Sequence, residues 1–114
     1  MKYWVAASLL ALTVSAILPG SAAQAAGKSY GWCALLDEQN GTAYYSAVFQ
    51  GDPAKKADYQ RQFQAKAEAE GDDVMGTASC SFTPDKAKAQ AEHDKNKTVA
   101  RKTLDYIVDL TWKP

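Results

Sequence analysis

Two cysteines, Cys33 and Cys80, are the only ones in this chain of 114 residues, and whether they pair limits what the chain can fold into. In an exported protein an even pair is most simply one disulfide, because compartments outside the cytoplasm are oxidising. In the chain-entropy model, closing a loop of this length stabilises a domain by about 4 kcal/mol. The spacing contains no C-x-x-C motif, so a structural cross-link is favoured over a redox-active pair.

The first 25 residues indicate export. Lys2 gives a positive start, residues 4–18 form a run without a charge, and Pro19-Gly20 interrupts it. Ala23-Gln24-Ala25 matches the small-residue cleavage site of a secretory signal peptide, which places the mature start at Ala26. The alternative is a membrane anchor, but a spanning helix needs about 20 apolar residues and this run is shorter. We expect a signal peptide over 1–25 and one soluble domain over 26–114, in the periplasm or outside the cell.

The charge balance excludes several classes of partner. The chain carries 13 basic and 13 acidic side chains, and cleavage removes only Lys2 from this set. A near-neutral domain has no electrostatic attraction for nucleic acid or for an anionic membrane surface. No later segment is apolar enough to insert into a bilayer, and no motif indicates a cofactor. The oligomeric state stays open.

Residue patterns predict four strands and two helices. Alternation of apolar and polar residues predicts strands over 30–36, 42–49, 74–82 and 103–112. Asn40-Gly41 predicts a hairpin between the first two strands. Helix-forming residues predict helices over 53–70 and from Asp85 to about Asn96, with Asp52 and Pro53 starting the first and Thr83-Pro84 the second.

These elements predict a small α+β fold in the order β-β-α-β-α-β. We expect two layers, an antiparallel or mixed sheet with both helices on one face. A Cys33–Cys80 disulfide would make the first and third strands neighbours. In the strands, alternation puts the apolar residues of each on one face: Ala43, Tyr45, Ala47 and Phe49 in the second, and Leu104, Tyr106, Val108, Leu110 and Trp112 in the last. In the helices, the helical period puts on one face Tyr59, Phe63 and Ala67 in the first, and Ala87 and Ala91 with Ala89 in the second.

Candidate catalytic and metal-binding residues are few. His93 is the only histidine and lies in the polar run Glu92-His93-Asp94, so we expect a solvated helix residue. Asp72-Asp73 forms a turn but lacks the spaced oxygen ligands of a calcium loop, so no metal site is predicted. A carboxylate pair for hydrolysis remains open, although alternation places Asp105 and Asp109 on the outer face of their strand.

Aromatic residues on the predicted hairpin are the candidate binding residues. Trp32 and Tyr30 share one face of the first strand, and Tyr44 lies opposite Tyr45 on the second. One set belongs to the core, and the other would form an exposed patch that binds a partner. Which face is exposed stays open, so the candidate binding residues are Trp32, Tyr44 and Tyr45. In the alternative, helices or loops cover both sets.

The segments Tyr44–Phe49 and Val108–Pro114, with a polar helix and Cys80 between them, resemble a group of small exported bacterial proteins of no assigned function. This resemblance covers most of residues 26–114 and implies no catalytic or binding residue. In outline the plan is also similar to the small cell-wall-binding SPOR domains, although a hairpin comes first here. The second similarity concerns the fold alone.

Three functions fit the sequence. The favoured one is a non-catalytic, secreted or periplasmic module that binds a protein or envelope partner; inhibitors and immunity proteins are subtypes of this class. The second is a small envelope hydrolase that uses carboxylates or His93. The third is a structural or stress-related envelope protein.

Overall fold

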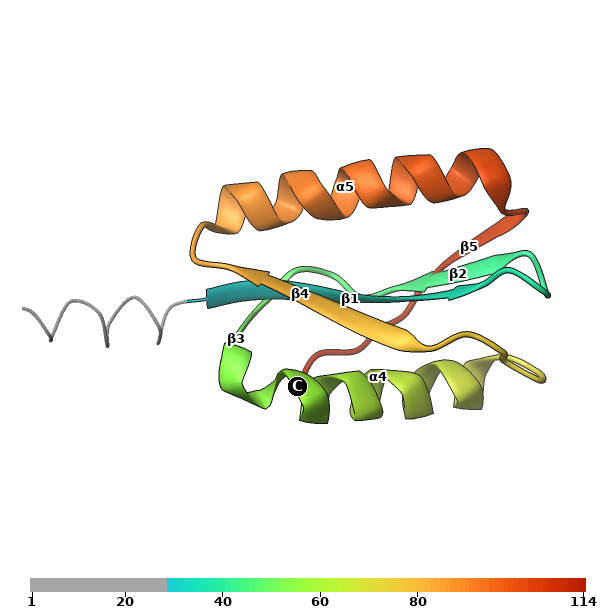
Figure 1. Cartoon of the computed structure of the whole chain (residues 1–114), viewed down its shortest axis with the longest axis horizontal. Helices are drawn as coiled ribbons and strands as arrows, with labels where there is room; N and C mark the ends of the chain where they lie inside the picture. The colour runs from blue at the N-terminus through green and yellow to red at the C-terminus, as the bar shows by residue number, and fades with distance from the viewer. Residues whose placement is uncertain (1–28) are drawn as a thin grey trace, which may run out of the picture.

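The computed structural model describes residues 29–114, so the predicted signal peptide lies outside the described residues. Five strands and two long helices form the domain (Figure 1). The strands are β1 (Ser29–Asp37), β2 (Thr42–Tyr45), β3 (Phe49–Gly51), β4 (Ala78–Thr83) and β5 (Tyr106–Asp109). The 3₁₀ turn η1 (Pro53–Lys55) precedes α4 (Lys56–Glu70), and α5 (Lys86–Thr103) joins β4 to β5. This confirms a small α+β fold.

The longest strand, β1, is the centre of a mixed sheet. On one side it pairs antiparallel with β4, and on the other it pairs antiparallel with β2 and β3. Strand β5 lies beyond β2 and runs parallel to it. The predicted hairpin at Asn40-Gly41 joins β1 to β2, and Gly41 has the positive φ of 65° that this turn requires.

The two helices cover opposite faces of the sheet, which corrects the expected two-layer arrangement with both on one face (Figure 1). Helix α4 carries the chain from β3 across β1 to β4, and α5 carries it back from β4 to β5. Crossovers between parallel strands share one hand. Here the two crossovers have the same hand but cross the sheet in opposite directions. Their helices must therefore lie on opposite faces of the sheet. The strand order therefore decides the layering.

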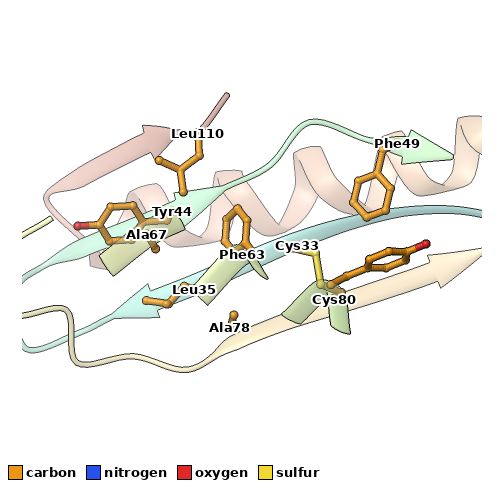
Figure 2. Packing of buried hydrophobic residues seen from close by; sticks show 10 residues of the cluster. Cys33, Leu35, Tyr44, Phe49, Phe63, Ala67, Ala78, Cys80 and Leu110 are labelled. Carbon is orange, nitrogen blue, oxygen red and sulfur yellow. A yellow bond between two sulfur atoms is a disulfide. The ribbon is translucent and has the colours of Figure 1, made fainter. Parts of the chain in front are cut away.

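The α4 side holds the larger core and the disulfide (Figure 2). Cys33 and Cys80 are direct partners in the β1–β4 ladder and form the predicted disulfide, which confirms that the first and third strands are neighbours. The predicted stripe of Tyr59, Phe63 and Ala67 faces this core and is buried. Aromatic rings meet edge-on around it: Phe63 lies 5.4 Å from Trp112 between ring centroids.

The α5 side holds a smaller core over Trp32, Ala43 and Tyr45. Helix α5 runs seven residues past Asn96 and buries Ala89, His93 and Ala100, so the predicted inner face of Ala87 and Ala91 is wrong. Its N-cap is Asp85, whose side chain accepts a hydrogen bond from the Ala87 N–H. Alanines at every second or fourth position do not by themselves show which of them faces the sheet.

Two predicted strands are shorter in the structure. Strand β4 begins at Ala78, because residues 71–77 form a loop. Strand β5 spans only Tyr106–Asp109, and Tyr106 is 66% exposed while Leu110 is buried. Leu104 packs on the α5 side and Val108 and Trp112 on the α4 side, so the five alternating apolar residues do not share one face.

Candidate functional site

A bulge interrupts the predicted second strand at Ser46-Ala47-Val48. Ala34 pairs with Tyr45 and Gly31 pairs with Phe49, so three residues of this strand face two residues of β1. The extra residue reverses the alternation. Tyr45 therefore faces α5 whereas Phe49 faces α4, and the prediction that they share a face is wrong.

Ser46 holds the bulge against β1. Its backbone N–H donates to the Cys33 carbonyl at 2.9 Å, and its hydroxyl oxygen accepts from the Cys33 N–H at 2.8 Å. The same hydroxyl donates to the Ala47 carbonyl at 2.9 Å. With only 2% of its surface exposed, Ser46 replaces the ladder bonds that the bulge breaks.

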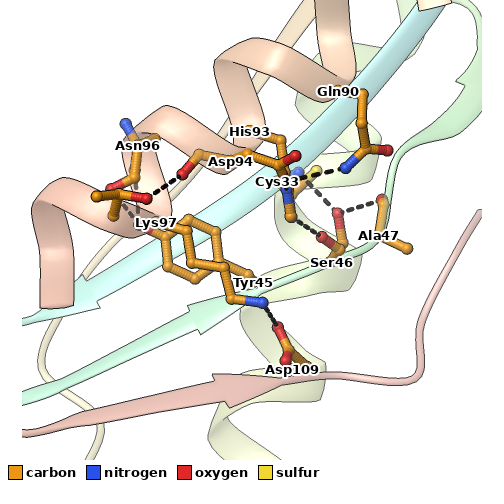
Figure 3. Close-up of polar contacts among 11 residues, drawn as sticks. Cys33, Tyr45, Ser46, Ala47, Gln90, His93, Asp94, Asn96, Lys97 and Asp109 are labelled. Atoms are coloured by element: carbon orange, nitrogen blue, oxygen red, sulfur yellow. Dashed lines mark hydrogen bonds and ion pairs between the residues drawn. The ribbon is translucent and has the colours of Figure 1, made fainter. Parts of the chain in front are cut away.

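His93 reaches the bulge from α5 (Figure 3). Its Nε2 lies 2.9 Å from the Ser46 carbonyl oxygen, and its Nδ1 lies 2.9 Å from Oδ1 of Asp94. The ring packs edge-on against Trp32 and Tyr45, with centroids 5.6 Å and 5.7 Å away. His93 is only 6% exposed, so the prediction of a solvated helix residue is wrong. The polar neighbours Glu92 and Asp94 point outward from a helix whose inner face includes His93.

The contacts of His93 suit it to hold the backbone. Nε2 faces a carbonyl oxygen and must donate to it, because a carbonyl oxygen only accepts. Nδ1 faces a carboxylate oxygen. A general base needs a ring nitrogen with a free lone pair that faces the proton it removes, and here both nitrogens face acceptors. The hydrogen bond from His93, followed by that from Gln90, lowers the pKa of Asp94.

The three aromatic residues predicted to bind a partner belong to the core. Trp32 and Tyr44 are 7% and 6% exposed, and Tyr45 is fully buried. Tyr44 faces α4 and the other two face α5, so the helices cover both sets and no exposed patch of these residues forms. Burial raises the pKa of Tyr45, whose hydroxyl donates to Oδ1 of Asn96 at 2.6 Å.

An open cleft of about 810 Å³ lies beside the bulge. Its floor is apolar, with Val48, Leu110 and Trp112, and α5 contributes Gln90, His93 and Lys97. Lys66 reaches the cleft from α4, and Lys113 from the C-terminal segment. Asp109 is the one acidic lining residue and pairs with Lys97 at 2.5 Å (Figure 3). The lining thus carries three lysines against one carboxylate.

Other acidic residues are dispersed. The buried carboxylate of Asp37 accepts from Asn40 and from the Met75 N–H, so it fixes the hairpin turn and the loop before β4. Asp105 and Asp109 are exposed, as predicted for the outer face of their strand. Within residues 29–114, no group of three histidine, cysteine or acidic side chains is placed to hold a metal ion.

Sequence reasoning did not identify the cleft. Ser46 and Lys97 carried no motif, and Lys66 and Lys113 belong to unrelated segments. One signal was present: Ser46, Ala47 and Val48 break the aromatic pattern of the strand at its middle. A bulge could have been suspected there, but not the residues that converge on it.

Comparisons with protein-family models, with curated proteins and with solved structures find no match to this chain. Among residues 29–114, neither helix combines the length and the apolar character needed to cross a bilayer.

Proposed function

We propose that this protein is an exported, non-catalytic binding module that recognises a protein partner through the cleft beside the bulge. The cleft itself carries the proposal: its lining combines apolar side chains with polar and cationic ones, which is the composition of a recognition site. An inhibitor or immunity protein of an exported enzyme is one form of this function.

The side chains at the cleft favour binding over hydrolysis. Ser46 is buried, and its hydroxyl both donates to and accepts from the backbone. Both nitrogens of His93 face oxygen acceptors. A nucleophile and base have to face each other, whereas Nε2 of His93 lies against the carbonyl oxygen of Ser46. These groups support a rigid surface instead.

Two features support export. The N-terminal residues have the layout of a signal peptide, and the disulfide lies in the core with both cysteines at most 1% exposed. The proposal predicts that protein isolated from a native host begins at Ala26 and contains no free thiol. Intact-mass measurement checks both, and a cytoplasmic, unprocessed, reduced chain would rule out this part of the proposal.

Site-specific photo-crosslinking in the native host tests the binding function. A photoreactive residue replaces Ala47, an exposed residue of the cleft lining, and the matched control carries it at exposed Ala69 on α4. We expect a discrete protein adduct from position 47 and none from position 69. Adding Thr111→Trp, which places a bulky side chain in the cleft lining, should reduce the adduct while far-UV circular dichroism stays unchanged. The same adducts from both positions, or an adduct that Thr111→Trp does not reduce, would contradict the proposal.

A further inference from the structure

We infer that the free edge of β3, next to the cleft, accepts an extended acidic segment of the partner as an added β-strand. This inference rests on the proposed function and specifies its partner chemistry. Strand addition joins a peptide to a sheet edge through main-chain hydrogen bonds, and side-chain pockets then select the sequence.

The register shows that β3 presents backbone groups away from the sheet. The N–H and C=O of Cys33 point toward Ser46, so the odd-numbered residues of β1 face β2 and β3. Tyr30 therefore directs its backbone groups toward β4, and its partner Gln50 directs its own away from β1. In the described sheet β3 pairs with β1 alone, so the Gln50 N–H and C=O lie on a free edge.

Strand β5 leaves this edge uncovered. Strand β5 runs beside β2. The last hydrogen bond between these two segments runs from the N–H of Leu110, just after β5, to the Tyr45 carbonyl at 2.8 Å. The chain then turns to the α4 side (Figure 1). There Trp112 packs edge-on against Phe49, with ring centroids 5.6 Å apart. The cleft is lined by Ser46, Ala47 and Val48, the residues that directly precede β3.

The opposite edge of the sheet, on β4, is partly capped by side chains. On β4 the N–H groups of Ala78 and Cys80 donate to the amide oxygens of Gln64 and Gln60 at 2.7 Å and 3.1 Å. These glutamines on α4 occupy the positions that a pairing strand would need. On the β3 side the Tyr59 hydroxyl accepts from the Asp52 N–H at 3.1 Å, whereas in the described sheet the Gln50 N–H and C=O stay free, which makes Gln50 the point where a strand would add.

The lysines of the cleft define the charge of the incoming segment. Lys66, Lys97 and Lys113 line it, and Asp109 neutralises one of them. Glu70 pairs with Lys66 at 3.4 Å, so within residues 29–114 Lys113 is the lining lysine without an ion-pair partner. Opposite charges steer association and fix the register of a bound peptide. Carboxylates on one side of an extended segment would meet the lysines, while apolar residues on the other would contact Val48 and Leu110.

Peptide titration of the isotopically labelled mature protein tests the inference by NMR. The probe is a short acetylated peptide of alternating valine and glutamate, with lysine-for-glutamate and backbone N-methylated versions as controls. We expect saturable shifts of the amides of Gln50, Ala47 and Val48 with the acidic peptide only. Exposed lysines provide matched variants: Lys113→Gln should weaken binding roughly twofold to fivefold, and Lys88→Gln should leave it unchanged.

Gln50→Pro tests the edge itself. It removes an N–H that points away from β1, and proline is tolerated where the N–H of an edge strand faces solvent. We expect a folded protein that no longer binds the acidic peptide. Binding that survives Gln50→Pro or N-methylation, shifts confined to Tyr106–Asp109, or no binding of the acidic peptide would overturn strand addition. Crosslinking from position 47 would still report on the binding function, so the two failures are distinguishable.

Discussion

Reduction of the Cys33–Cys80 disulfide should remove a large part of the stability of this domain. The two residues are 47 positions apart, and the chain-entropy model assigns a loop of this length about 4 kcal/mol. Domains of this class have total unfolding free energies of about 5–15 kcal/mol. Both cysteines are buried and reduction removes no heavy atom from the core, so the chain-entropy model attributes the loss mainly to the freed unfolded chain.

Urea unfolding followed by the fluorescence of Trp32 and Trp112 measures this loss. The disulfide is reduced in the unfolded state before refolding, because both cysteines are buried. We expect a lower midpoint and a steeper denaturant dependence for the reduced protein, since its unfolded state is less compact. The Cys33→Ala/Cys80→Ala variant is the control and should not respond to reductant. Equal unfolding free energies with and without the disulfide would refute the reasoning.

Three further predictions concern single side chains. His93→Ala leaves the buried Ser46 carbonyl without its donor and removes two aromatic contacts, so it should lower the unfolding free energy by about 2–4 kcal/mol. His93→Gln keeps a donor and should cost less. Equal losses for the two variants in thermal unfolding would contradict the role of the hydrogen bond. Gly31→Ala places a Cβ 2.5 Å from the Phe82 ring and 2.9 Å from the Ser81 carbonyl oxygen, so it should lower the unfolding free energy by about 1–3 kcal/mol. An unchanged melting temperature would show that this contact can relax. Hydrogen bonds, first that from the Asn40 side chain, hold the pKa of Asp37 below its ordinary value. The stability that Asp37 contributes is therefore fully present above its ordinary pKa and is lost as the pH falls through the lowered pKa. Asp37→Asn should flatten the pH dependence of stability in this acidic range, and an unaltered pH profile would contradict the prediction.

The candidate site was predictable only in part. Composition drew attention to the hairpin strands, and the bulge beside the cleft lies in the second of them. The aromatic residues there turned out to be core, because helices cover both faces. His93 was judged by its polar sequence neighbours, although burial on a helix depends on which face meets the sheet. Lys66, Lys97 and Lys113 converge only through the fold, and nothing local marks them.

Local chemistry in the sequence determined the elements that depend on neighbouring residues. Asn40-Gly41 specified the hairpin, Asp52 and Pro53 the start of η1, and the spacing of Tyr59, Phe63 and Ala67 the buried face of α4. The tertiary structure decided the strand order, the placement of the helices on opposite faces and the bulge at Ser46. These features depend on contacts between residues far apart in the chain, where the direction of each crossover and one extra residue in a ladder change which side chains meet.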